Sequence, residues 1–178
     1  RVEALASAIV GSLNNIFVSH IEGGEVSGTI DELIRHSVSK LSHFHLVAND
    51  KARSRLLQMG EREESVFVIG SPDVDIMFSD KLNSIDFVKK HYEIPFKYFS
   101  ILMFHSVTTE LESIKEYAAN LVDEVLNSNL NYIVILPNND LGSGDIFNEL
   151  RRLENNENIK IYPSIRFEYF LVLLKYSQ

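Results

Sequence analysis

Short apolar segments rich in β-branched and aromatic residues recur along the chain, and turn-forming residues bound each of them. Such segments are typical of β-strands. Between them, apolar residues recur every three or four positions, as in residues 30–41 and 111–125, which is typical of amphipathic helices. The six predicted strands cover Ile16–Ile21, Phe44–Ala48, Val66–Ile69, Phe99–Phe104, Tyr132–Leu136 and Ile159–Tyr162.

The predicted strands show little polar alternation, so helices are expected to cover both of their faces. Strands that alternate with helices in this way predict an α/β fold with mostly parallel sheets. Proline-containing and polar stretches interrupt the alternation within residues 71–95, and we place a domain boundary near Asp80. Residues 1–80 and 81–178 are then expected to be parts of two Rossmann-like domains.

The composition of the 178 residues, 45% hydrophobic and 24% charged, is typical of a globular protein. Seventeen Lys and Arg residues against 25 Asp and Glu residues give a net charge of −8, which argues against nucleic acids and anionic membranes as partners. The chain has no cysteine, which excludes disulfides, thiolate metal sites and cysteine nucleophiles. No apolar run approaches the ~20 residues of a membrane-spanning helix.

Polar residues follow four of the predicted strands directly. In open α/β sheets ligands bind at the carboxyl ends of the strands, because loops and helix amino ends gather there. We therefore expect these residues to form one polar rim. The four segments are Glu22-Gly23-Gly24-Glu25, Gly70-Ser71-Pro72-Asp73, His105-Ser106 and Pro137-Asn138-Asn139-Asp140.

The first of these segments leads into a predicted helix with Thr29 as N-cap and Glu32 completing a capping box. Asp31 and Arg35 lie four residues apart, so they share one helix face near the rim. Their spacing fits a surface ion pair as well as a functional pair. Glu22 is a stronger site candidate, because it follows a buried strand and precedes two glycines that allow close approach.

Histidines and a polar loop supply the remaining candidates. His105 ends an apolar strand, which fits a catalytic role as well as a half-buried structural one. His20 points away from Ile21 by strand alternation and is interpreted as a core residue. The other histidines show no metal-ligand spacing, so no metal site is assigned. The loop that contains Asn138 fits ligand binding and equally an ordinary turn.

A long block of these residues resembles one enzyme family, the hydrolysing UDP-N-acetylglucosamine 2-epimerases of sialic acid and capsule synthesis. The most specific part runs through His20-Ile21-Glu22-Gly23-Gly24-Glu25-Val26-Ser27-Gly28-Thr29-Ile30-Asp31-Glu32 to Arg35-His36 and Lys40-Leu41-Ser42-His43. The order and spacing agree over essentially the whole chain. Further matching segments are Gly70-Ser71-Pro72 with Asp75, Phe104-His105-Ser106-Val107-Thr108 and Pro137-Asn138-Asn139-Asp140-Leu141-Gly142-Ser143.

The resemblance implies a glycosyltransferase-B-like fold, a cytoplasmic homo-oligomer, and UDP-N-acetylglucosamine and UDP as ligands. It implies conversion of UDP-N-acetylglucosamine and water to N-acetylmannosamine and UDP, through elimination to a 2-acetamidoglucal and hydration. The resemblance also implies that this reaction requires neither NAD nor an obligatory metal. The residues that match the family's functional positions are the acid/base carboxylates Glu22 and Asp31, the accompanying Arg35, His105 at the leaving diphosphate, and Arg1 and Asn138 near the nucleotide. Which carboxylate takes which proton stays open.

The chain also departs from the family pattern. It begins at Arg1 without methionine and ends at Gln178, each inside a helical pattern, so we expect an internal piece of a longer protein. The family's phosphate-binding segments before and after this region are absent, and the isolated chain is expected to be inactive. Two alternatives stay open: an epimerase acting on a UDP-diacetamido sugar of legionaminic acid synthesis, and a non-catalytic truncated sugar-nucleotide-binding module.

Overall fold

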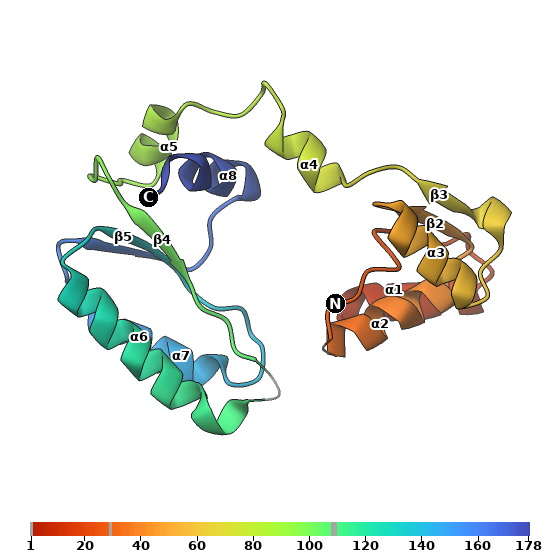
Figure 1. Cartoon of the computed structure of the whole chain (residues 1–178), viewed down its shortest axis with the longest axis horizontal. Helices are drawn as coiled ribbons and strands as arrows, with labels where there is room; N and C mark the ends of the chain where they lie inside the picture. Colours follow the sequence, from red (N-terminus) through yellow and green to blue (C-terminus); the bar gives the residue numbers. More distant parts are fainter. Residues whose placement is uncertain (1, 29, 108–109) are drawn as a thin grey trace. The chain divides into compact units, whose positions relative to one another are not determined.

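The computed structural model describes residues 2–28, 30–107 and 110–178, which form two compact units, 1–78 and 79–178 (Figure 1). Six strands occur where the apolar runs predict them, so the predicted α/β class is confirmed. They are β1 (Ser19–Ile21), β2 (Phe44–Val47), β3 (Val66–Val68), β4 (Ser100–Met103), β5 (Tyr132–Ile135) and β6 (Ile159–Tyr162). The interpretation of the units as partial Rossmann-like domains stays a prediction.

Eight α-helices and three short 3-10 helices connect the strands in the described part of the chain. No described helix combines the length and the apolar character that a membrane span requires. The α-helices are α1 (Val2–Leu13), α2 (Ile30–Lys40), α3 (Asp50–Gln58), α4 (Pro72–Met77), α5 (Ile85–His91), α6 (Ile114–Ser128), α7 (Ser143–Leu150) and α8 (Phe167–Tyr176). The 3-10 helices are η1 (Glu63–Ser65), η2 (Leu111–Ser113) and η3 (Arg151–Leu153).

The first unit contains a parallel sheet of order β1-β2-β3. The strand register places His20, His45 and Val66 in one row across this sheet, and Val66 joins a core with residues of α3. The opposite face carries Ile21 and Phe67, which are 54% and 46% exposed. Coverage of both strand faces, expected from the sequence, is therefore not found in this sheet.

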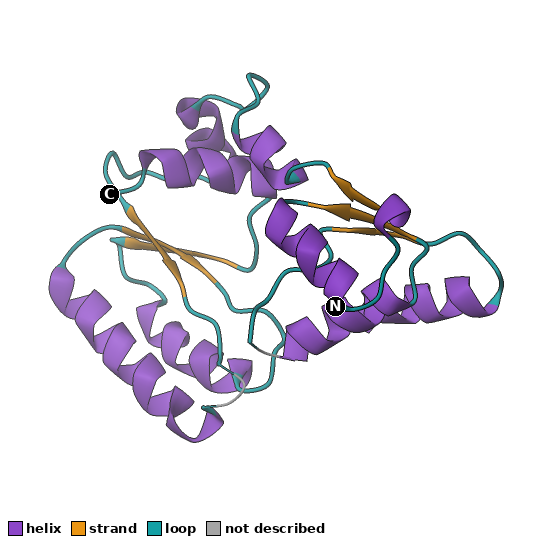
Figure 2. Cartoon of the chain, turned by 45° about the vertical axis from the view of Figure 1, so that its right-hand side comes forward, coloured by secondary structure: helices purple, strands orange, loops and turns teal. Residues whose placement is uncertain are grey.

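The second unit has the expected three layers. Its parallel sheet has the order β4-β5-β6. Ile133 and Val134 are successive residues of β5 with no exposed surface, and each belongs to a different core cluster. Figure 1 shows α6 and α7 on one side of this sheet and α5 and α8 on the other, and Figure 2 shows helices on both sides of its strands.

Candidate active site

Glu22 lies at the first position after β1, in a backbone conformation that non-glycine residues seldom adopt. Its φ is +61°, in the left-handed region that costs an L-residue about 1–2 kcal/mol. Two contacts hold it there: the Glu22 N–H donates to the Leu46 carbonyl at 2.8 Å, and the Ser71 hydroxyl donates to Glu22 Oε1 at 2.5 Å. Because strain persists only where the surroundings enforce it, this carboxylate is a strong candidate for a functional role.

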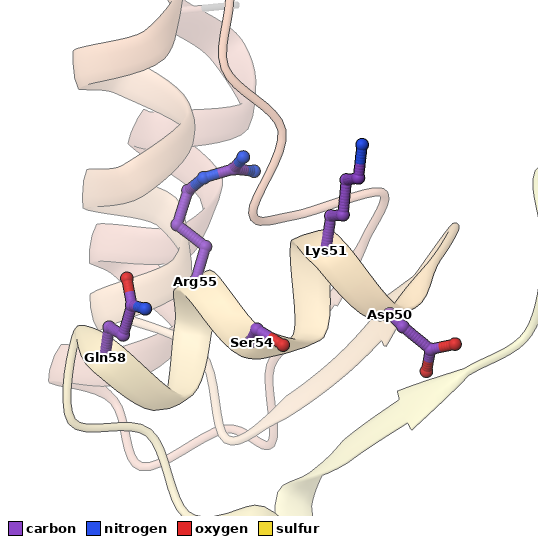
Figure 3. Close-up of a pocket in the computed structure, with 5 residues that line it drawn as sticks. All are labelled: Asp50, Lys51, Ser54, Arg55 and Gln58. Carbon is purple, nitrogen blue, oxygen red and sulfur yellow. The ribbon is translucent and has the colours of Figure 1, made fainter.

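Helix α3 supports the turn that follows Glu22. Gly24 has a φ of +81°, and a Cβ at this position would lie 2.5 Å from the Ala52 carbonyl oxygen. The Arg55 guanidinium donates to the Gly24 carbonyl, and the Asn49 amide donates to the Glu25 carboxylate at 2.7 Å. Figure 3 shows Arg55 on the face of α3 that borders a polar surface pocket. The turn is therefore fixed by backbone packing and by two side-chain hydrogen bonds.

Replacing Gly24 by Ala should lower the melting temperature of the full-length protein much more than Gly60→Ala. Both glycines have a positive φ, +81° and +87°, so both variants carry a backbone cost of about 1–2 kcal/mol. Only at Gly24 does the new Cβ also collide with backbone, and such overpacking costs a further ~1–3 kcal/mol. Equal losses of melting temperature in the two variants would show that α3 does not confine the turn.

Helix α2 carries the second candidate carboxylate, Asp31, in its first turn, and the candidate Arg35 one turn later. The Arg35 guanidinium donates to the Glu25 carbonyl at 3.0 Å and to the Ser27 hydroxyl at 3.3 Å. The loop after Glu22 is thereby tied back onto α2. The structure thus places Glu22, Asp31 and Arg35 on one connected loop-helix segment.

Glu32 has a structural role at the start of α2, as the capping interpretation predicts. Its carboxylate accepts hydrogen bonds from the Ser27 and Gly28 N–H groups at 3.0 and 2.8 Å. These backbone bonds are the main reason that its pKa lies below the usual value. The predicted N-cap, Thr29, lies outside the described residues, and so does Arg1.

The second unit places His105 and Asn138 at the carboxyl edge of its own sheet. His105 is exposed and follows β4 by two residues, and Asn138 is exposed and follows the neighbouring strand β5 by three. The loops after these strands pack closely, because a Cβ at Gly142 would lie 3.4 Å from Ser106 Cβ. The Asn138 side chain accepts a hydrogen bond from the Asp140 N–H at 3.3 Å. The polar segments therefore belong to two sheet edges, one in each unit.

His20, interpreted from the sequence as a core residue, is half-buried in the structure. Its Nδ1 lies 3.0 Å from the Ser39 hydroxyl, and burial lowers its pKa to about 4, with the nearby positive charges of His45, Arg35 and His36 acting in the same direction. The His45 side chain has no exposed surface, and its Nε2 lies 3.1 Å from the Glu61 carboxylate. No group of three or more potential metal ligands occurs among the described residues.

The lowered pKa of His20 predicts acid-sensitive stability. The unfolded chain binds a proton at His20 as the pH falls through the ordinary value of 6.5, whereas the folded protein resists protonation down to about pH 4. Stability from this group is therefore complete above pH 6.5 and is lost between 6.5 and about 4. We expect the melting temperature of the wild type to fall more across this window than that of His20→Asn. Parallel curves for the two proteins would contradict the lowered pKa of the half-buried imidazole.

Two contributors escaped prediction from the sequence. Ser71 was expected on the polar rim but not as a partner of Glu22, to which its hydrogen bond spans 49 positions. Ser39 lies inside a helical pattern with nothing to mark it. The Gly-Ser-Pro segment at the carboxyl end of β3 was the available signal for Ser71, because it belongs to the expected polar rim.

Comparison with known proteins decides the family. The family model described as UDP-N-acetylglucosamine 2-epimerase matches residues 1–178. The chain belongs to this family. It is 52% identical over 178 residues to the UDP-N-acetylglucosamine 2-epimerase of Neisseria meningitidis, covering 100% of the chain and 47% of that protein. It is 36% identical to the hydrolyzing UDP-N,N'-diacetylbacillosamine 2-epimerase of Legionella pneumophila, covering 99% of the chain and 47% of that protein.

Solved structures similar to this chain include members of the same family. The crystal structure of Methanocaldococcus jannaschii UDP-GlcNAc 2-epimerase in complex with UDP-GlcNAc and UDP superposes with a TM-score of 0.71 at 21% identity. The match covers 98% of this chain and 50% of that one. The predicted glycosyltransferase-B-like fold is thereby confirmed. The chain spans about half the length of the curated relatives it matches.

Proposed function

We propose that the full-length protein carrying this chain converts UDP-N-acetylglucosamine and water to N-acetylmannosamine and UDP, in the synthesis of sialic acid. The observation that carries this proposal is the carboxylate arrangement: Glu22 is held in a strained conformation on the loop that Arg35 ties to α2, which also bears Asp31. Family membership and the named activity of the Neisseria relative support it.

The reaction needs a base at C2 of the sugar, a donor at the leaving diphosphate and an acid for the return of a proton. The base removes the C2 proton, the C1–O bond breaks, and its electron pair leaves on the β-phosphate oxygen of UDP. Water then adds across the double bond of the 2-acetamidoglucal. Hydroxide bonds to C1, and a proton bonds to C2 on the face opposite to the one from which the first proton was removed. We assign the two proton transfers to Glu22 and Asp31 as a pair.

The remaining candidates are assigned to the leaving group, to the nucleotide or to the support of the carboxylates. His105 donates to the departing diphosphate, and Arg35 supports the two carboxylates. Asn138 lies near the nucleotide, and Arg1, outside the described residues, has the same proposed role. The substrate is a nucleotide sugar, and we propose a cytoplasmic homo-oligomer that works with neither NAD nor an obligatory metal.

The test is product identification by NMR after incubation of the full-length protein with UDP-N-acetylglucosamine. N-acetylmannosamine and UDP in equal amounts are expected. A parallel incubation with UDP-N,N'-diacetylbacillosamine addresses the second candidate, which the 36% identity to the Legionella relative favours. Faster turnover of that sugar would assign the protein to the diacetamido class. Binding of UDP without turnover of either sugar would identify a non-catalytic module.

A further inference from the structure

A chain of hydrogen bonds crosses from β1 to α2 beneath the candidate active-site loop. His20 Nδ1 lies 3.0 Å from Ser39 Oγ, and Ser39 Oγ donates to the Arg35 carbonyl at 3.2 Å. We assign the single hydroxyl hydrogen of Ser39 to that carbonyl, so that the Ser39 oxygen accepts a hydrogen bond from His20 Nδ1–H. Ser39 is fully buried, so water does not compete for these bonds.

The turn after Glu22 rests directly on this pair. A Cβ at Gly23 would lie 2.8 Å from His20 Nδ1 and 3.0 Å from Ser39 Oγ, so only glycine fits at this position without displacing them. His20 precedes Glu22 by two residues, and Ser39 follows Arg35 by one helical turn. Each end of the hydrogen-bond chain therefore adjoins a candidate functional residue.

We propose that His20 and Ser39 are positioning residues of the active site. Through the Arg35 carbonyl they fix the end of β1, which carries Glu22, against the helix that carries Asp31 and Arg35. The proposal rests on the function given above, since it assigns these carboxylates to the reaction. A base and an acid that act on opposite faces of one sugar carbon need a fixed separation, and a displacement of about 1 Å can slow such a reaction ~100-fold.

His20 is half-buried, and its contact with Ser39 gives it a structural contribution. Its pKa of about 4 keeps the imidazole neutral near neutral pH, and its one assigned proton is engaged with Ser39. We therefore assign the proton transfers to the two carboxylates and not to this ring. Its contribution is the direction of the Nδ1–H bond, which a side-chain amide at the same place can reproduce.

The first test reads the hydrogen-bond chain without any activity measurement. Nitrogen-15 NMR of the histidine rings in the full-length protein is expected to show His20 as the neutral tautomer protonated at Nδ1. In Ser39→Ala this resonance should shift, because the acceptor is gone. A proton on Nε2 in the wild type, or an unchanged Nδ1 resonance in Ser39→Ala, would overturn the proposal whatever the protein's activity.

The second test uses kinetics on variants whose folding is verified by thermal melting. Ser39→Ala and His20→Leu are expected to lower kcat by about 10- to 100-fold with little change in KM. His20→Asn, whose amide nitrogen replaces Nδ1, should recover most of that loss, whereas His20→Gln, with its amide farther out, should not. Equal losses in the Asn and Leu variants, or wild-type kcat in Ser39→Ala, would overturn the positioning role. Absence of turnover in the wild type would instead contradict the proposed function, and the NMR result would still decide the hydrogen-bond chain.

Discussion

Replacing His105 by Ala in the full-length protein is expected to slow the release of UDP from UDP-N-acetylglucosamine by ~100-fold or more. The departing diphosphate concentrates negative charge at one point, and the loss of a single preorganised donor there typically costs ~10²–10³ in rate. His105 is exposed at the carboxyl end of β4, beside the loop that follows β5, which is where ligands of α/β sheets bind. The measurement is the initial rate of UDP release at saturating substrate.

A matched control for His105 exists in the same unit. His91 is also an exposed histidine, but it ends α5 and its ring contacts Tyr92 and Tyr169. His91→Ala should therefore retain the wild-type rate per folded molecule. Near-normal UDP release by His105→Ala, or an equal loss in both variants, would remove His105 from the leaving-group site.

Asp31→Asn should abolish most of the activity while leaving the fold nearly intact. The two side chains have similar volumes, so the fold loses mainly a favourable charge near the amino end of α2, worth ~0.3–1 kcal/mol. Loss of a positioned proton carrier typically slows a reaction by ~10²–10⁴-fold. Initial rates and melting temperatures measured on the same preparation separate the two effects.

For the neighbouring carboxylate, Glu32, we expect a loss of stability without a loss of rate. Glu32 accepts hydrogen bonds from the Ser27 and Gly28 N–H groups, so Glu32→Gln should lower the melting temperature and keep the rate per folded molecule. If Asp31→Asn showed that same pattern, Asp31 would be a structural acid of the helix and not a carrier of protons.

Most strands could be predicted because apolar residues dominate them, but their ends could not. The first strand was expected over Ile16–Ile21 and is observed only over Ser19–Ile21. The preceding residues bond elsewhere: the Ile16 N–H donates to the Gly11 carbonyl at the end of α1, and the Val18 N–H donates to the His43 side chain. Apolar character alone does not distinguish these partners from a strand ladder.

The candidate site was predicted in its residue types and not in its contacts. Glu22 could be singled out because a carboxylate after a buried strand and before two glycines is unusual. Its left-handed backbone and its hydrogen bond to Ser71 depend on how β1 and β3 end around β2, which no local pattern specifies. Ser39 could not be found for the same reason, because its partner His20 becomes a neighbour only when α2 packs beside β1.

The most direct test of the proposed chemistry follows single atoms through the reaction. The full-length protein is incubated in D₂O with UDP-N-acetylglucosamine that carries ¹⁸O at the bond between C1 and the diphosphate. The elimination and hydration route predicts N-acetylmannosamine with one deuterium at C2 and all of the ¹⁸O in UDP, because the C1–O bond breaks and solvent supplies the C2 proton. UDP-N-acetylmannosamine as the final product, a sugar without deuterium at C2, or ¹⁸O in the free sugar would each contradict this account.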